Sequence, residues 1–517
     1  MPPLRYPGYE RAPTDLATPP LGSRLAWTAL LALLYVATSV LGWRHPLIFD
    51  EIWYLLHAAR PLGEQVESLR LELVHPPLMY LLERVWMGAF GHSDNAVKAL
   101  VACINLASIS LFASLAPLVV RQWRLASFLF ATAYLQVGGV PNLARSYSLG
   151  LLFTITALLA WELWRRQPKG AFLALWATSM FLLGYSHYVG LLLLGPFVLA
   201  NWLYGHRRGL FMGSAVLVVG GFLPWFVSVL PVYLSRGLEY NVAWIDEGPW
   251  VALAKLPFHL LTYLPAGWNP LGENDWPITT SWRHLMMVAA VGIHAVLAFA
   301  ARRRLRALWS PRAGQEETAA RFWALFALAV FPAVVLIVFS LLVRPIFSAR
   351  YLAFVLPMYW LLIVMLVEHG GGVARWALGF VVVPWLLAGI AVPLTRTLGT
   401  PGLHDSLAFV EDHIQPADLI LAERLAGPQV YWQWTRAFRR PEPVIIVSSV
   451  RPPLDPPELP LSDLEDVSLD DVARVWFFET SYDRRNVMRI RAHLTGCGFQ
   501  LTSVRANLPF LAVFERR

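Results

Sequence analysis

Residues 25–51 read LAWTALLALLYVATSVLGWRHPLIFDE, an uncharged apolar run that ends at Arg44 and is followed by two adjacent carboxylates. The apolar part, residues 25–43, has the length of about 20 residues that a helix needs to cross the hydrocarbon core of a bilayer. Asp50 and Glu51 follow a few residues later. The stretch therefore predicts a membrane-spanning helix that delivers two acidic side chains close to the membrane surface.

The composition extends this prediction to most of the chain. Of its 517 residues 57% are hydrophobic and only 15% are charged, whereas a soluble protein carries about 25% charge. The 23 Trp and 17 Tyr suit a protein with two membrane–water interfaces, where amphipathic rings settle. The net charge of +8 comes from arginines beside apolar runs, which indicates membrane topology and not a nucleic-acid partner. Cys103 and Cys497 are expected to form neither a disulfide nor a metal site.

Ten further apolar runs of comparable length predict about eleven transmembrane helices in total. These runs lie at 95–119, 125–141, 148–164, 171–186, 188–205, 209–232, 285–301, 322–343, 351–368 and 376–395. The pair around Tyr185–Tyr188 is consistent with two short helices or with one broken helix. The polar, Pro-rich first 22 residues lack a basic region leading into a short hydrophobic segment, so the first span is expected to be a retained signal anchor.

The distribution of lysine and arginine predicts the orientation, because cytoplasmic loops are enriched in these residues. With the N-terminal tail, 1–24, in the cytoplasm, the cationic loops fall on the cytoplasmic side. Their cations are Arg121, Arg124, Arg165, Arg166, Lys169, Arg207, Arg208, Arg302, Arg303, Arg304, Arg306 and Arg375. The short loops opposite hold little beyond Arg145, Arg344 and Arg350. The transmembrane module, 25–395, then has two large external loops, 44–94 and 233–284.

The external tail, 396–517, is predicted to be a small soluble α/β domain. It combines a helical pattern from His404 to His413 with short β-like runs. The runs are Leu419–Leu421, Val444–Val447, Val475–Phe478 and Phe510–Phe514. A Pro-rich segment, 452–460, is expected to form a loop within the domain.

The first external loop holds two candidate elements. A carboxylate such as Asp50, close to low-dielectric surroundings, can have a raised pKa and serve as a base, with Glu51 beside it. The alternative is a solvated acidic pair that caps a following helix, Ile52–Arg60. The second element is His75-Pro76-Pro77-Leu78, in which two prolines fix the backbone. The imidazole of His75 is then suited to bind a phosphate or orient a carboxylate, or it is simply hydrated at the interface.

Further candidates fall on the same side of the membrane. Arg145-Ser146-Tyr147 and His187 lie in short external loops, and Arg350-Tyr351 stands at the head of a late span. Arg350 either reaches to the interface as an anchor or binds phosphate oxygens with its planar fork. Lys98, at the start of the second span, belongs to the same set with lower weight. An external cavity with this composition suits an anionic lipid headgroup.

The ordered motifs resemble those of the bacterial GT-C glycosyltransferases, in the protein-mannosyltransferase-like and aminoarabinose-transferase-like branch. The resemblance covers roughly residues 25–395. It implies that Asp50 is catalytic with Glu51 as its partner, and that Arg350 neutralises the donor phosphate. It places His75 near the lipid phosphate, where the aminoarabinose-transferase-like members have lysine. Lys98 stands where many members have arginine.

The resemblance implies a bacterial inner-membrane enzyme that moves a sugar from a polyprenyl-phosphate donor to an external acceptor. Asp50 would take the acceptor proton, with inversion, while Arg350, His75 and Arg145 stabilise the leaving phosphate. The acceptor is a glycan, a lipid or a protein. No cofactor is certain, and a divalent metal is left open. The alternatives are an undecaprenyl-diphosphate-dependent polymerase or ligase, a lipid-linked sugar transporter or flippase, and a non-catalytic partner subunit.

Overall fold

The chain is described by a computed structural model that covers most of the apolar runs and of the C-terminal domain. The described residues are 19–42, 47, 49–72, 75–135, 142–236, 250, 253, 256, 280–309, 316–343, 346–397, 403–423, 426–437, 444–447, 461–479, 484–505 and 510–517. Most of the N-terminal tail, most of the loop 233–284, Arg344 and the segment 452–460 lie outside them.

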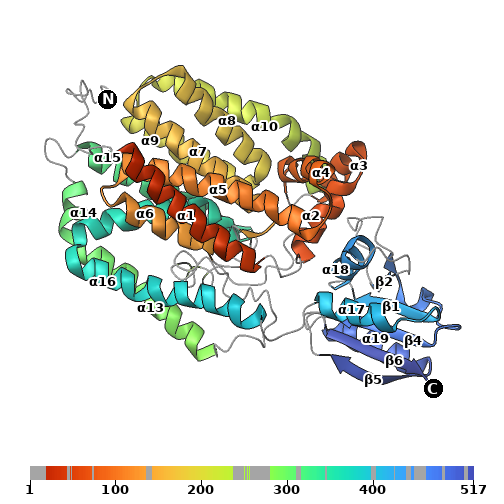
Figure 1. Ribbon diagram of the computed structural model, residues 1–517. Helices are drawn as coiled ribbons and strands as arrows, with labels where there is room; N and C mark the ends of the chain where they lie inside the picture. Colours follow the sequence, from red (N-terminus) through yellow and green to blue (C-terminus); the bar gives the residue numbers. More distant parts are fainter. Residues whose placement is uncertain are drawn as a thin grey trace.

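The chain folds into a bundle of long helices with three short helices at one end (Figure 1). The short ones are α2 (Phe49–Ala59), α3 (Leu62–Glu72) and α4 (Leu78–Phe90). The bundle contains α1 (Leu21–Gly42), α5 (Asp94–Val119), α6 (Trp123–Leu135), α7 (Ser146–Arg166), α8 (Gly170–Ser186), α9 (Leu194–Tyr204), α10 (Arg208–Arg236), α13 (Thr280–Ala300), α14 (Arg302–Trp309), α15 (Glu316–Leu342) and α16 (Leu356–Thr397). The described part of the chain is therefore mainly helical, as predicted.

The helices agree with the predicted apolar runs in position. Among the described residues, six helices are long and apolar enough to cross a membrane, and three more are shorter apolar helices. The number of eleven spans stays a prediction. The last two runs, 351–368 and 376–395, meet at a bend in α16, where Gly371 has a φ of 69° that glycine adopts most readily.

The run 188–205 is not one continuous α-helix. After α8 ends, His187 is extended, and the chain continues as a 3-10 helix, η2 (Tyr188–Leu193), before α9 begins. The structure thus has two short apolar helices here, Gly170–Ser186 and Tyr188–Tyr204, which is the first of the two arrangements that the sequence left open around Tyr185–Tyr188. The break between them turns the His187 side chain into the interior, where it is only 3% exposed.

Helix α7 lies in the interior of the bundle, whereas α10 lies at its surface. Trp161 and Trp164 of α7 are fully buried, but Val216 and Leu217 of α10 are 63% and 76% exposed. Large exposed aliphatic side chains on a helix that is apolar all round suit contact with lipid. This contrast places the polar side chains of α7 inside the protein.

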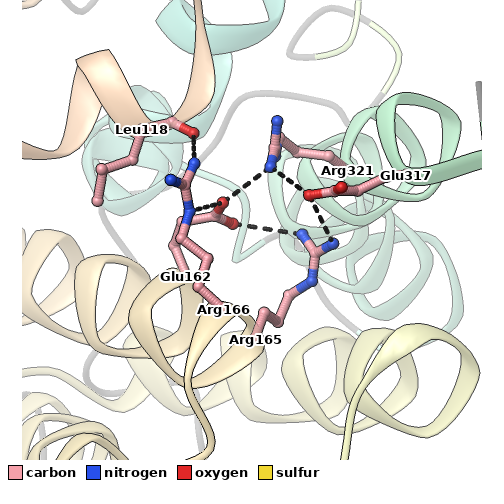
Figure 2. Close-up of polar contacts among 6 residues, drawn as sticks. All are labelled: Leu118, Glu162, Arg165, Arg166, Glu317 and Arg321. Atoms are coloured by element: carbon pink, nitrogen blue, oxygen red, sulfur yellow. Dashed lines mark hydrogen bonds and ion pairs between the residues drawn. The ribbon is translucent and has the colours of Figure 1, made fainter. Parts of the chain in front are cut away.

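The C-terminal end of α7 carries a cluster of charges, the Glu162 cluster, made of Glu162, Arg165, Arg166, Glu317 and Arg321 (Figure 2). Glu162 accepts hydrogen bonds from Arg165 and Arg166 on its own helix and from Arg321 on α15. Arg166 also donates to the Leu118 carbonyl of α5. The cluster thereby ties three helices together at one end of the bundle.

The C-terminal domain contains a six-stranded sheet in the order β3-β2-β1-β4-β6-β5. Its strands are β1 (Asp418–Glu423), β2 (Val444–Val447), β3 (Leu461–Ser462), β4 (Arg474–Glu479), β5 (Phe499–Arg505) and β6 (Phe510–Arg516), and its helices are α17 (Leu403–His413), α18 (Gly427–Trp432) and α19 (Arg484–Gly496). The first four strands in this order are parallel, and β6 and β5 are antiparallel to their neighbours. All four predicted strands and the predicted helix are confirmed; β3 and the edge strand β5 were not predicted.

The domain docks on the short helices at the end of the bundle (Figure 1). Gln429 of α18 donates to the Leu47 carbonyl at 3.0 Å, and Gln433 donates to the Asp94 carboxylate at 2.7 Å. The same carboxylate accepts from the Leu47 amide at 3.2 Å. Apolar side chains of α2, including Ile52, share one buried cluster with the domain. The domain therefore packs directly on the helix that carries Asp50.

Candidate active site

Three segments that are far apart in the sequence converge on the carboxylate of Asp50. Asp50 lies in the first turn of α2, Arg145 immediately precedes α7, and Arg350 lies in a 3-10 helix, η3 (Ala349–Val355). Nη1 of Arg145 and Nη1 of Arg350 both donate to Oδ2 of Asp50, the second at 3.2 Å. We call these three residues the Asp50 cluster.

A close approach between α7 and η3 brings the two arginines together. Gly150 lies one turn into α7, and a Cβ at this position would overlap the ring of Phe354 in η3. Glycine therefore lets η3 approach the helix backbone. Since Arg145 and Arg350 stand near the beginnings of α7 and η3, this contact sets the separation of their guanidinium groups.

Aromatic rings surround the guanidinium group of Arg145. The group lies 5.3 Å from the ring centroid of Tyr54 and 5.5 Å from that of Tyr147, within cation–π range. Tyr54 is stacked on Tyr80 at 4.1 Å between centroids. Nη2 of Arg145 lies 3.3 Å from Nε2 of His75. Because arginine has no acceptor, His75 accepts this hydrogen bond and its Nε2 is unprotonated.

His187 extends the aromatic wall towards the late helix. Its ring lies 5.6 Å from His75, 5.3 Å from Tyr147 and 5.5 Å from Tyr351. Nδ1 of His187 accepts from the Val189 amide at 3.2 Å. The neutral ring therefore carries its proton on Nε2, which has no hydrogen-bond partner among the described residues. The structure thus gathers His75, Tyr147, His187 and Tyr351 around the Asp50 cluster.

Two cations control the ionisation of the site. Burial alone would raise the pKa of Asp50, but the charges of Arg145 and Arg350 outweigh it and hold the pKa below its usual value. Burial lowers the pKa of His75 and of His187, and the neighbouring arginines lower both further. At neutral pH the site therefore holds an ionised carboxylate and two neutral imidazoles.

The predicted raised pKa of Asp50 is wrong for this state of the protein, because two guanidinium groups contact the carboxylate. The alternative of a solvated acidic pair is wrong for Glu51, which is only 6% exposed, whereas Asp50 keeps 33% of its side chain exposed while it contacts both arginines. Oε1 of Glu51 accepts from the Ala144 amide at 2.8 Å. Glu51 thereby fixes the backbone immediately before Arg145, which is a positioning contact.

Lys98 lies on α5 and is attracted to Asp94 and Glu51. Its attraction to Glu51, the neighbour of Asp50 in the sequence, places Lys98 next to the Asp50 cluster. The sequence had placed Lys98 with the phosphate-binding residues at lower weight. Its role as a phosphate ligand stays a prediction.

Two further residues of the site, Tyr54 and Glu83, were not predicted from the sequence. Tyr54 lies four residues after Asp50, so the helical repeat of α2 places both on one face, and this spacing was the available signal. Glu83 of α4 is 1% exposed, and neither of its carboxyl oxygens has a hydrogen-bond partner among the described residues. Burial and the charge of Glu51 raise the pKa of Glu83 well above its usual value. In the amphipathic pattern of this helix, Glu83 looks like an ordinary surface residue.

The described residues contain no group of three or more His, Cys, Asp or Glu side chains that could hold a metal ion.

No family model and no curated protein matches the sequence. The structure is similar to that of ArnT, an aminoarabinose transferase from Cupriavidus metallidurans, solved with bound undecaprenyl phosphate. The identity is 13%, the match covers 95% of this chain and 98% of ArnT, and the TM-score is 0.52. An oligosaccharyltransferase from Archaeoglobus fulgidus, solved with Zn and sulfate, matches at 14% identity over 78% of this chain and 61% of its own, with a TM-score of 0.40.

The likeness to ArnT extends over nearly the whole of both chains, and it includes the helical bundle and the C-terminal domain. It confirms the predicted fold class: the protein has the GT-C fold, with a bundle of membrane-type helices and a small C-terminal sheet domain. The likeness to the oligosaccharyltransferase is too weak to support a further argument. At an identity of 13%, the match to ArnT shows the fold and not the activity.

Proposed function

We propose that the protein is a membrane glycosyltransferase that moves a sugar from a polyprenyl-phosphate donor to an acceptor on the external face of a bacterial inner membrane. The observation that carries this proposal is the convergence of Arg145 and Arg350 on Asp50 beside His75. The GT-C fold agrees with it, because ArnT was solved with undecaprenyl phosphate. In this orientation the N-terminus is cytoplasmic and the C-terminal domain is external.

The two arginines are suited to bind the donor phosphate. A guanidinium group presents parallel N–H donors that match phosphate oxygens, and it stays charged when buried. The side chains of Arg145 and Arg350 are 8% and 18% exposed, so water screens their charges weakly. Positive charge held in place before the reaction stabilises the negative charge that develops on a leaving phosphate.

Asp50 is the proposed base. An oxygen lone pair of the acceptor hydroxyl attacks the anomeric carbon, and the bond from that carbon to the phosphate oxygen breaks. The bonding electrons leave with the polyprenyl phosphate, and the hydroxyl proton moves to the Asp50 carboxylate. One displacement of this kind inverts the anomeric configuration. His75 accepts a hydrogen bond from Arg145 and so orients it, which makes His75 a positioning residue in this proposal.

The test is turnover by the purified protein in lipid nanodiscs. Polyprenyl-phosphate sugars are supplied with a glycolipid extract, and release of polyprenyl phosphate is measured for the wild type and for Asp50→Asn. We expect turnover by the wild type and a loss of about 10³-fold in the variant, within the range of general base catalysis. Glu67→Gln is a matched control, because Glu67 lies on α3 of the same external loop and its side chain is 59% exposed. A correctly folded Asp50→Asn protein with wild-type turnover would exclude this mechanism.

A further inference from the structure

The proposed base is held in a state that makes it a poor base. Its carboxylate already has two guanidinium partners, and both stabilise the ionised form. A carboxylate in this position binds a proton weakly. For Asp50 to act as proposed, something must separate it from the arginines during the reaction cycle.

The geometry of the Asp50 cluster suits such a separation. Both arginines donate to the same oxygen, Oδ2, so one rotation of the Asp50 side chain releases both contacts. Asp50 is also the most exposed of the three side chains, at 33% against 8% for Arg145 and 18% for Arg350. The anion is therefore the most accessible member of the cluster, and Arg145 is held in place by His75 and by the rings of Tyr54 and Tyr147.

The Glu162 cluster is a buried ion cluster of the same protein with which the exposure and bonding of Asp50 can be compared. Glu162 is 2% exposed, and both of its carboxylate oxygens accept hydrogen bonds, from three arginines in total. Removing that anion would leave Glu317 as the one carboxylate of the cluster facing three arginines, two of them buried. At the Asp50 cluster an incoming anion has access, so the same cost does not arise.

We propose that Asp50 is a resident anion that occupies the position of the donor phosphate, and that binding of the donor displaces it. The phosphate takes over Arg145 and Arg350, and the released carboxylate turns to the acceptor as the base. The identity of the phosphate as a polyprenyl phosphate rests on the proposed function. The exchange itself requires only an anion that both guanidinium groups can bind.

The exchange orders the reaction cycle. Without the donor, the two arginines balance the negative charge of the ionised Asp50 carboxylate, which is then a poor base for an acceptor hydroxyl. With the donor bound, the carboxylate lies beside a phosphate and has lost both cations, which raises its pKa. After transfer Asp50 carries the proton of the acceptor. Return of Asp50 to the arginines then releases this proton to water and competes with the polyprenyl phosphate, which assists product release.

Binding of sugar-free undecaprenyl phosphate tests the exchange. The wild type, Asp50→Asn, Asp50→Glu and the control Glu67→Gln are compared in nanodiscs of uncharged phosphatidylcholine, and the dissociation constant is measured with correct folding verified by thermal unfolding. We expect Asp50→Asn to bind at least about tenfold more tightly than the wild type, because the negative charge that competes for the two arginines is gone. Asp50→Glu keeps the competing charge and should bind like the wild type, as should Glu67→Gln.

The outcomes separate this inference from the proposed function. Equal or weaker binding by a folded Asp50→Asn protein, with the wild type binding, would overturn the exchange and leave the donor class intact. Absence of binding by every variant would overturn both. Inorganic phosphate is the second probe: tightening with both probes supports recognition of the phosphate group alone, and tightening with the lipid only supports recognition that includes the polyprenyl chain.

A second measurement does not depend on a variant. In a structure of the wild type with undecaprenyl phosphate bound, we expect phosphate oxygens within hydrogen-bond distance of both guanidinium groups, and we expect the Asp50 carboxylate to contact neither of them. A bound phosphate elsewhere, with Asp50 still contacting both arginines, would contradict the exchange.

Discussion

Each end of α7 carries a cluster of arginine–carboxylate ion pairs, and the two clusters differ in how their carboxylates are bonded and exposed. Arg145 immediately precedes the helix and belongs to the Asp50 cluster, and Glu162 to Arg166 at its other end belong to the Glu162 cluster. With 21 residues the helix is about 30 Å long, so the clusters lie about one membrane thickness apart. Their comparison separates a candidate reactive site from a structural one.

Net charge does not distinguish the clusters. Two cations face one anion at the Asp50 cluster, and three cations face two anions at the Glu162 cluster, so each has one positive charge in excess. The difference lies in saturation and exposure. Glu162 uses both oxygens and is nearly inaccessible, whereas Asp50 uses Oδ2 for both arginines and is one-third exposed. A partly exposed anion that uses one oxygen for both cations is the feature on which we base the proposed exchange with the donor phosphate.

The largest difference between the two ends is expected for their cations. Arg350→Ala should reduce turnover by about 10²–10³-fold, because one preorganised donor to the leaving phosphate is lost. Its effect on the thermal unfolding temperature should be small, since Arg145 still neutralises Asp50. Arg321→Ala at the other end is the matched variant and should show the reverse pattern. Comparable turnover in the two variants would contradict the assignment of a reactive role to the Asp50 cluster and a structural role to the Glu162 cluster.

The anion of the structural cluster gives the next largest effect. Glu162→Gln leaves the buried Arg165 and Arg321 and the partly exposed Arg166 with one carboxylate fewer, and loss of one partner of a buried pair costs about 3–5 kcal/mol. Thermal unfolding in nanodiscs, followed by tryptophan fluorescence, measures this loss. Turnover per folded molecule should stay near that of the wild type. If Glu162→Gln is as stable as the wild type, the cluster does not hold α5, α7 and α15 together.

A smaller effect is expected from the contact that sets the separation of the two arginines. Gly150→Ala places a methyl group against the Phe354 ring and should displace η3, and with it Arg350. Overpacking of this kind costs about 1–3 kcal/mol. We expect turnover to fall by about tenfold, since small displacements of catalytic groups reduce rates strongly. Gly213→Ala on α10 is the control, because an added Cβ there has open space.

The smallest effect concerns Glu83, a buried carboxyl whose two oxygens have no hydrogen-bond partner among the described residues. The pKa of Glu83 is raised in the folded state, so the folded protein binds more protons than the unfolded chain between the two pKa values. Stability is therefore highest below the pKa of an unfolded-chain glutamate, and it falls as the pH rises through the raised pKa. Glu83→Gln should lose this part of the pH dependence. Unfolding temperatures of both proteins across the pH range measure the difference, and identical curves would show that Glu83 does not titrate as described.

The sequence was informative where local pattern determines structure. Apolar run length located the membrane-type helices, and short apolar β-like runs located β1, β2, β4 and β6 of the C-terminal domain. Motif order led to the GT-C fold. The edge strand β5 was missed because its Leu501 and Val504 are exposed and half of its residues are polar or charged.

The sequence could place the candidate residues on one side of the membrane, but it could not pair them. Asp50 is separated from Arg145 by 95 positions and from Arg350 by 300. Their contact depends on how α2, α7 and η3 pack, and the direction of the Asp50 pKa shift depends on that contact. For the same reason, Glu51 was expected to assist Asp50 and was found bound to the Ala144 amide.

The hydrogen bonds from Gln429 and Gln433 also have a mechanical consequence. They fix the C-terminal domain to Leu47 and to Asp94, on the two sides of the first external loop. A rocking motion of the domain would therefore tilt α2 and shift the carboxylate that lies in its first turn. A large molecule that displaces the domain from outside the membrane would therefore shift Asp50 without contacting it.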